Sequence, residues 1–280
     1  MEALNIKRVC AVCFSPTGNT KRLVQTIAAE LAGRLCCSLM QLDFTPPQAR
    51  ETVTEFGEGD LVVVGSPTYA GKLPNKILPD FQTKLKGHGA AAVAVVTFGN
   101  RAYDNSLAEL VETLRAGGFH PAAGAAFACR HAFTDSLAPG RPDGNDFQAA
   151  AQFAQHAADS IRQLAGLPDP PVVPGKADAP YYIPKGLDGQ PAQFLKAKPL
   201  TLEEACTHCG LCARLCPLGS IDPADVTRVP GVCIKCHACV RGCPEGAKYF
   251  DAPAFLSHAA MLNENYREPK DNEFYLSPSF

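Results

Sequence analysis

One cysteine pattern occurs twice in this chain, and it constrains the fold more than any other feature. The two copies are Cys206-x-x-Cys209-x-x-Cys212-x-x-x-Cys216 and Cys233-x-x-Cys236-x-x-Cys239-x-x-x-Cys243, and each is followed by proline. They contain eight of the 13 cysteines, while the other five are scattered over the first 129 of the 280 residues. A chain folded around a single core would not concentrate its thiols in this way, so we expect two domains.

The spacing within each copy is typical of ligands to an iron–sulfur cluster. Three thiolates separated by two residues surround one corner of a cubane cluster, and the fourth cysteine, farther along the chain, crosses to the other cluster. We therefore predict two [4Fe–4S] clusters. The predicted ligands are Cys206, Cys209, Cys212 and Cys243 for the first cluster, and Cys233, Cys236, Cys239 and Cys216 for the second.

A zinc module is the main alternative to this interpretation. Structural zinc sites usually take four ligands as two separated pairs, which would leave the third cysteine of each triplet without a role. His208 and His237 stand between the cysteines, but the thiols already supply every ligand that two clusters need. We predict that both histidines are neighbours of the clusters and not ligands. Over about residues 200–250 the chain resembles bacterial two-cluster ferredoxins.

The first 166 residues have a different pattern, in which short apolar runs alternate with amphipathic segments. Two of the runs, 60–65 and 90–98, are almost continuously apolar, as expected when helices cover both faces of a parallel sheet. This alternation predicts a doubly wound α/β fold with a five-stranded parallel sheet. The predicted strands are 7–14, 38–44, 60–65, 90–98 and 119–129.

The rest of the chain completes the predicted organisation. Residues 167–199 contain eight prolines and no sustained period, which indicates an extended linker. Residues 200–252 form a small α+β cluster domain, and residues 253–280 form a helix and a polar tail that we expect along the surface. The α/β domain then occupies residues 1–166.

Three segments follow predicted strands, at the edge where doubly wound sheets bind their ligands. Residues 15–20 (SPTGNT) open the first helix and can hold a phosphate, although the same residues suit an ordinary helix cap. Residues 66–74 contain Tyr69, which can stack on a flat ligand, and Gly71, which lets the backbone approach a ring. Residues 97–104 are again polar and aromatic. One phosphate loop and two aromatic loops suit FMN.

These loops resemble those of flavodoxins over residues 1–166, and the whole chain resembles the flavodoxin–ferredoxin fusion proteins of anaerobic bacteria and archaea. The resemblance implies a set of residues for each part of FMN. The phosphate would contact Ser15, Thr17, Gly18, Asn19 and Thr20. One side of the isoalloxazine would contact Pro67, Thr68, Tyr69, Ala70 and Gly71, and the other side Gly99, Asn100, Tyr103 and Asp104.

Two features depart from the flavodoxin pattern. The chain has no tryptophan, so the ring that many flavodoxins stack on one face of the flavin is replaced or absent. Lys72 follows Gly71 where flavodoxins often carry an acidic residue. A cation beside the flavin favours its reduced, anionic form. We therefore expect a less strongly reducing FMN than that of a typical flavodoxin.

The cysteines outside the duplicated pattern need no function beyond packing. Cys10 and Cys13 form a Cys-x-x-Cys that could suggest a redox dithiol. On a strand, however, these two positions point to opposite faces, so we predict core thiols. We expect the same of the other three, which are Cys36, Cys37 and Cys129.

The composition argues against several other classes of protein. A net charge of −2 gives no electrostatic basis for binding nucleic acid or an anionic membrane surface. No stretch approaches the roughly 20 apolar residues of a membrane helix, and the amino terminus lacks the apolar block of a signal peptide. We expect a cytoplasmic protein, because clustered cysteines in a reducing compartment more often bind metal than form disulfides.

Together the two cofactors predict a redox protein. We predict that it transfers electrons between two [4Fe–4S] clusters and FMN and exchanges them with a ferredoxin-type donor or acceptor protein. Two alternatives remain open, which are an FMN-dependent reductase of a small molecule fed by the clusters, and a redox- or oxygen-sensing module. The long loop 130–144 favours a lid over a substrate, and hence the reductase. No catalytic residue can be assigned.

Overall fold

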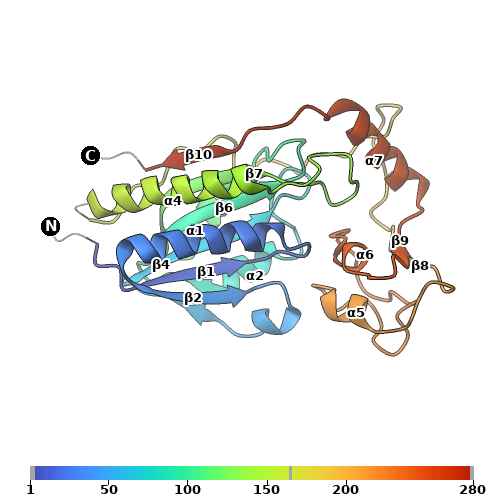
Figure 1. Cartoon of the computed structure of the whole chain (residues 1–280), viewed down its shortest axis with the longest axis horizontal. Coiled ribbons are helices and arrows are strands. Elements are labelled where there is room, and N and C mark those ends of the chain that lie inside the picture. Colours follow the sequence, from blue (N-terminus) through green and yellow to red (C-terminus); the bar gives the residue numbers. More distant parts are fainter. Residues whose placement is uncertain (1–3, 164–165, 278–280) are drawn as a thin grey trace.

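The five predicted strands form the parallel part of one sheet in the computed structural model, which describes residues 4–163 and 166–277. These strands are β1 (Arg8–Cys13), β2 (Ser38–Asp43), β4 (Asp60–Pro67), β6 (Ala91–Phe98) and β7 (His120–Ala128). Their spatial order, β7-β6-β4-β1-β2, is the flavodoxin-type order of a doubly wound sheet. The predicted fold class is therefore confirmed. The carboxyl ends of the strands face the cysteine-rich module (Figure 1).

Helices cover both faces of this sheet because successive strand residues point to opposite sides. One face packs against α1 (Asn19–Leu35) and α4 (Gly144–Gln163), and the other against α2 (Leu78–Lys84) and α3 (Ser106–Ala116). In Figure 1, α1 and α4 lie in front of the sheet and α2 lies behind it. Each layer has its own hydrophobic core, so the strands are buried on both sides, as their continuous apolar runs predict. Three short elements complete the domain, namely η1 (Pro47–Arg50) and the paired strands β3 (Thr54–Glu55) and β5 (Leu85–Lys86).

The cysteines of the α/β domain follow the predicted packing with one exception. Cys13 packs in the core beneath α1 and Cys10 in the core on the opposite face, which confirms that they are not a dithiol. Burial raises the pKa of Cys10 to about 11 and that of Cys13 to about 12. Cys36 was expected in the core and is exposed, because it ends α1 in a left-handed conformation with φ of 54°.

The sheet has six strands, so the predicted count of five is wrong. The C-terminal segment forms β10 (Glu273–Leu276), which pairs antiparallel with the outer edge of β7. Phe274 packs against Phe127 of β7 and Phe153 of α4. The tail therefore does not simply lie along the surface, and it covers backbone groups that an edge strand would leave unpaired.

The described part of the linker is extended, as predicted, but it is held against the α/β domain. The backbone N–H of Tyr182 donates to the Ala70 carbonyl at 2.8 Å, and the Tyr181 hydroxyl donates to the Leu73 carbonyl at 2.8 Å. Both acceptors lie in the loop after β4, which is one of the predicted FMN loops. The linker is therefore part of this loop's surroundings.

The cysteine-rich module consists of two copies that follow the same path of the backbone. Equivalent positions in the two copies lie 27 residues apart, as Cys206 and Cys233 do. Its elements are β8 (Leu200–Thr201), α5 (Leu211–Leu215), α6 (Ala238–Arg241) and β9 (Lys248–Tyr249), followed by α7 (Pro253–Asn265). Three pairs of equivalent positions have positive φ in both copies, which are His208 and Lys235, Gly210 and His237, and Gly219 and Gly246. The conserved turns show that the repeat extends to the backbone and is not limited to the cysteines.

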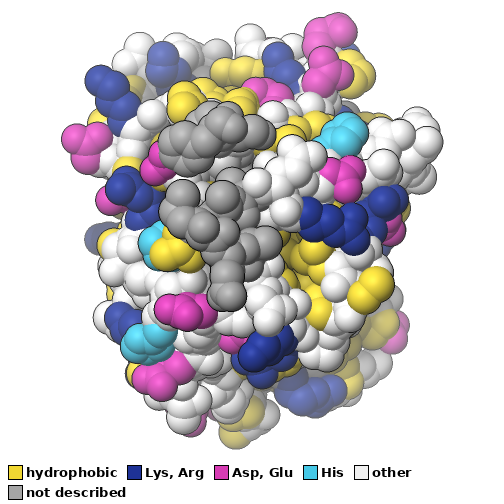
Figure 2. All heavy atoms as spheres, turned by 90° about the vertical axis from the view of Figure 1, so that its left-hand side faces the viewer, with side chains coloured by type: hydrophobic (Ala, Val, Ile, Leu, Met, Phe, Trp, Pro, Cys, Tyr) yellow, Lys and Arg dark blue, Asp and Glu magenta, His cyan; other side chains and the backbone are white. Residues whose placement is uncertain are grey.

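The opposite end of the molecule has mixed surface chemistry. There, basic and acidic side chains are interspersed with apolar ones on the face that Figure 2 shows. The ligand-binding edge of the sheet lies at the other end, where the strands meet the cysteine-rich module (Figure 1).

Candidate functional site

A cavity of about 510 Å³ lies between the carboxyl ends of the parallel strands and the second cysteine motif. The loops after β1, β4, β6 and β7 form one side of it. The linker, α7 and residues 232–236 form the other side. Its volume is in the range of small-molecule and cofactor sites, which is about 300–1,000 Å³. Residues of the α/β domain and residues of the C-terminal part of the chain therefore form this cavity together.

Most of the residues predicted for FMN line this cavity. Those that do so are Thr17, Asn19, Thr20, Pro67, Thr68, Tyr69, Ala70, Gly71 and Gly99. Ser15 and Gly18 are adjacent but do not line it. The Ser15 hydroxyl accepts the N–H of Lys21 at 2.9 Å, and Gly18 takes a φ of 88° to start α1. The Ser15 hydroxyl thus satisfies one N–H of the first turn of α1, and this turn contains no acidic side chain, so the positive end of the helix dipole still favours an anion at this corner of the cavity.

The loop after β4 forms a tight turn that only particular residues allow. Tyr69 and Lys72 exchange backbone hydrogen bonds at 2.8 and 3.2 Å, while Ala70 and Gly71 both have positive φ. A Cβ on Gly71 would lie 2.4 Å from the Asp104 carboxylate, so a larger residue would push the two loops apart. The turn holds Tyr69 against the cavity wall. Ala70 in a left-handed conformation is the kind of local strain that clusters at binding sites.

The structure does not bring three predicted residues, Asn100, Tyr103 and Asp104, to the cavity. The amide of Asn100 donates to the carbonyls of Tyr266 and Glu268 at 2.7 and 3.0 Å. The Tyr103 hydroxyl bonds with side chains of the β10 strand. The Asp104 carboxylate pairs with Arg101. Their side chains therefore anchor the C-terminal segment and the loop itself, and the partners of the first two lie more than 160 residues away in the sequence.

Lys72 also differs from the expectation. Its ammonium forms an ion pair with Glu109 at 3.0 Å and donates to the carbonyls of Ala177 and Ala179, both at 2.8 Å. The side chain is buried beneath the linker and does not line the cavity. We expected an FMN less strongly reducing than that of a typical flavodoxin because of Lys72, and the position of Lys72 removes the basis for this expectation. The cation from the second cysteine motif that lines the cavity is Lys235.

Several lining residues were missed because they lie outside the three predicted loops. The linker contributes Tyr181, Tyr182, Pro184, Phe194 and Leu195, and α7 contributes His258 and Leu262. Arg101 lies 4.1 Å above the Tyr182 ring. The adjacent tyrosines in a proline-rich linker are the one sequence signal that could have indicated a ligand here, since aromatic pairs are unusual in a solvated spacer.

The loop after β7 adds His131 to the cavity wall. Burial, together with the neighbouring His258 and His237, lowers the pKa of His131 to about 3. Its Nδ1 accepts the N–H of Phe133 at 3.1 Å, which assigns the proton of the neutral ring to Nε2. Gly99 makes room for this ring, because a Cβ there would lie 2.3 Å from it.

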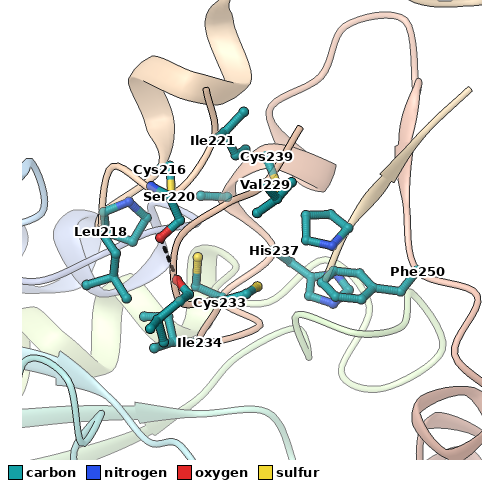
Figure 3. Close-up of a pocket in the computed structure, with 15 residues that line it drawn as sticks. Cys216, Leu218, Ser220, Ile221, Val229, Cys233, Ile234, His237, Cys239 and Phe250 are labelled. Carbon is teal, nitrogen blue, oxygen red and sulfur yellow. Dashed lines mark hydrogen bonds between the residues drawn. The ribbon is translucent and has the colours of Figure 1, made fainter. Parts of the chain in front are cut away.

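The eight cysteines of the duplicated pattern surround two smaller cavities, four around each. One cavity is lined by Cys206, Cys209, Cys212 and Cys243, and the other by Cys216, Cys233, Cys236 and Cys239. These are the two crossed sets that the spacing predicted. Backbone N–H groups of Ser220 and Ala247 donate to the Sγ atoms of Cys216 and Cys243, both at 3.3 Å. Figure 3 shows three cysteines of the second set around their cavity, with His237 and Phe250 beside it.

The four thiols around each cavity match the number of cysteine ligands that a [4Fe–4S] cluster takes. Across residues 4–163 and 166–277, no three Cys, His, Asp or Glu side chains are grouped as ligands of a single metal ion. In the same part of the chain both ring nitrogens of the buried His237 lack a partner. A buried donor without an acceptor costs about 1–3 kcal/mol, and the sulfur atoms of a cluster would supply acceptors.

The second cysteine set borders the large cavity, and the first set does not. Cys233 and Cys236 line both the second cysteine cavity and the 510 Å³ cavity. Burial raises the pKa of Tyr69, and the Cys236 and Cys233 thiols add to this effect. The cavity of the first set shares no lining residue with the large one, and its Cys209 is exposed.

Comparison with known protein families supports iron–sulfur binding by both cysteine copies. Two family models, both described as 4Fe-4S binding domains, match residues 201–222 and 230–246, one on each cysteine copy. A search of curated proteins found no match. Among the helices of the described residues, none has the length and apolar character needed to cross a bilayer.

Solved structures are similar to just over half of the chain. One is a flavodoxin from the domain Archaea, at 14% identity over 55% of this chain and 98% of that chain, with a TM-score of 0.35. Another is a short-chain flavodoxin associated with a non-canonical PDU bacterial microcompartment, at 14% identity over 56% and 99%, with a TM-score of 0.40. A third is an NADH:FMN oxidoreductase in its apo form, at 16% identity over 56% and 88%, with a TM-score of 0.38. The fold follows from the strand order and not from these likenesses.

Proposed function

We propose that this chain, which joins a flavodoxin-type α/β domain to a 4Fe–4S ferredoxin-type region, transfers electrons between two [4Fe–4S] clusters and one FMN. One observation carries the proposal. Cys233 and Cys236 line the cavity of the second cysteine set and also the large cavity at the edge of the sheet. A ligand in either cavity therefore contacts the same two side chains.

The thiolates of the two cysteine sets would hold the clusters. Apolar side chains, among them Ile221 and Val226, are buried beside them and exclude water. The backbone N–H groups that donate to the Sγ atoms stabilise the negative charge of the thiolates. The proposed ligands are Cys206, Cys209, Cys212 and Cys243 for one cluster, and Cys216, Cys233, Cys236 and Cys239 for the other.

FMN would occupy the large cavity, with its phosphate at the start of α1. Thr17 and Asn19 would contact the phosphate, and Tyr69 and Gly99 would flank the ring system. When bound, FMN takes up two electrons and each cluster carries one, so together they interconvert one-electron and two-electron transfer. The linker and α7 close the cavity from the other side.

A difference in exposure between the two cysteine sets supports different positions for them in this function. In the first copy Thr207, His208 and Cys209 are exposed, whereas Cys236, the equivalent of Cys209 in the second copy, is buried. We propose that a one-electron carrier protein of ferredoxin type docks at the first set. The second set then lies between that surface and the flavin. A reducing cytoplasm is the compartment that suits the exposed thiolates.

The experiment is anaerobic reconstitution with iron, sulfide and FMN, followed by rapid mixing with a reduced ferredoxin. We expect about eight iron atoms per chain and one FMN, with cluster signals that change before the flavin absorbance. Flavin reduction at an unchanged rate in protein that carries FMN but no clusters would contradict the proposal. So would clusters that bind while FMN does not.

A second candidate function is the reduction of a small molecule at the flavin. The observation that favours it is the cover over the cavity, which consists of Tyr181, Tyr182, Phe194, His258 and Leu262. A simple electron carrier has no need for an enclosed flavin. Reoxidation of the reduced holoprotein by one member of a panel of unsaturated small molecules would favour this function. Reoxidation by partner proteins alone would reject it.

A further inference from the structure

Lys235, from the second cysteine motif, is a buried cation. It is 9% exposed, and its ammonium donates to the carbonyls of Leu195 and Cys233, the latter at 3.0 Å. Within residues 4–163 and 166–277 it forms no ion pair with a carboxylate. We propose that Lys235 is the counter-ion shared by the flavin and the second cluster, and that it raises the reduction potential of both. This inference rests on the proposed function.

The charge balance of the large cavity supports this role. Among the residues that the structure describes, no aspartate or glutamate lines the cavity, whereas Lys76, Arg101, Arg130 and Lys235 do. Arg101 and Arg130 pair with aspartates, and Lys76 is exposed to solvent. Lys235 alone among these four is both buried and held only by carbonyl oxygens. Carbonyl oxygens carry only partial negative charge, so an anion bound beside Lys235 would stabilise its buried ammonium further.

The proposed cofactors supply that anion on two sides. A cluster held by four thiolates has a net negative charge, and reduction of either cofactor adds more. Lys235 lies between Cys233 and Cys236 in the sequence and lines the large cavity, so both charges would be near its ammonium. Electrostatic attraction is strongest in such a desolvated position. A cation there stabilises the reduced forms more than the oxidised forms.

The cysteine pattern itself does not require this lysine. The equivalent position in the first copy is His208, which has nearly the same φ, 52° against 54°, but is exposed. The backbone turn therefore accepts either residue, and the lysine is specific to the copy that faces the flavin. The linker carbonyl of Leu195 holds the ammonium in place.

The test measures the reduction potentials of FMN and of the clusters in the reconstituted holoprotein. Spectroelectrochemistry gives the potential of FMN, and an EPR-monitored titration gives those of the clusters. We expect K235Q to make the reduction of each neighbouring cofactor about tenfold less favourable. This equals a decrease of about 30 mV for the two-electron flavin couple and about 59 mV for the second cluster. The first cluster should keep its potential. K235R, which keeps the charge, should retain most of both values.

Matched variants separate this effect from general damage. H208Q changes the equivalent position of the first copy, which does not line the large cavity, and it should leave the flavin potential unchanged. Unchanged potentials in K235Q, or equal decreases in K235Q and K235R, would overturn the inference. If K235Q binds neither cofactor while K235R binds both, the result supports a role for the positive charge at this position. An equal loss of cofactor binding in both variants would contradict that role. Failure of the wild type to bind FMN or clusters would instead refute the proposed function.

Discussion

The two cysteine motifs share a sequence pattern and a backbone course, yet they have different surroundings. Arg214 and Arg241 occupy equivalent positions, 27 residues apart. Arg214 donates to the Cys209 carbonyl of its own motif, whereas Arg241 donates to the carbonyls of Ala132 and His131 in the α/β domain. The arginine at this position therefore stabilises its own motif in the first copy and contacts the α/β domain in the second copy. The two motifs therefore share their cysteine spacing, while packing decides which of the two cysteine sets borders the large cavity.

The largest expected effect comes from removing one ligand from each copy. We expect C236S to remove the second cluster and to abolish flavin reduction by a reduced ferredoxin, because Cys236 lines both cavities. C209S should remove the first cluster and slow delivery from the protein donor, while a small chemical reductant still reduces the flavin through the second cluster. Iron content, EPR spectra and rapid-mixing kinetics measure both. Equal kinetic defects in the two variants would contradict the proposed order of electron transfer, from the first cluster through the second cluster to the flavin.

The two arginines provide a second comparison. R241A removes charge-assisted hydrogen bonds to two carbonyls, and its exposed partner Asp135 adds little. We expect a loss of about 2 kcal/mol in the free energy of unfolding, measured by urea denaturation of the reconstituted protein. R214A removes one exposed hydrogen bond and should cost less than about 1 kcal/mol. A larger loss in R214A would contradict the assignment of Arg241 to the interface.

The loop after β7, which Arg241 contacts, contains His131, and this residue should make the free energy of unfolding depend on pH. An unfolded histidine has a pKa near 6.5, and burial lowers the pKa of His131 to about 3. The folded state therefore excludes a proton that the unfolded state binds. The stability from neutral His131 is fully present above about pH 6.5 and decreases by up to about 1.4 kcal/mol per pH unit as the pH falls toward 3.

Urea denaturation at several pH values below neutrality measures this slope. H131Q should reduce it by about one proton, and H208Q, in the exposed copy, serves as the control. A slope that H131Q leaves unchanged would show that His131 does not stay neutral in the folded protein.

The smallest expected effect concerns His237, whose equivalent in the first copy is Gly210. Its ring stacks on Phe250 at 4.8 Å, and its nitrogens have no partner in the described chain. If one N–H donates to the second cluster, H237F keeps the stacking and should make reduction of that cluster severalfold less favourable. H237N keeps a donor and should change it less. An EPR-monitored titration that gives the same potential for all three proteins would exclude the hydrogen bond.

Local patterns predicted much of the fold and part of the site. The five parallel strands could be predicted because continuous apolar runs report burial on both faces. The sixth strand could not, because β10 has only four residues and its partner β7 lies about 150 residues earlier. Thr17 and Tyr69 were found because they follow strands directly. Asn100 was predicted for the site but does not line the cavity, because its side chain donates to the backbone carbonyls of Tyr266 and Glu268.

Lys72 and Lys235 show most clearly where the sequence and the tertiary structure divide. The sequence by itself determined the crossed cysteine sets and the loops at the sheet edge, since ligand spacing and strand ends are local properties of the chain. It indicated a cation beside the flavin but named Lys72, which the tight turn after β4 directs to Glu109. Docking of the second motif brings Lys235 to the cavity instead. Only the tertiary structure decided this, because the direction of a charged side chain depends on partners far away in the sequence.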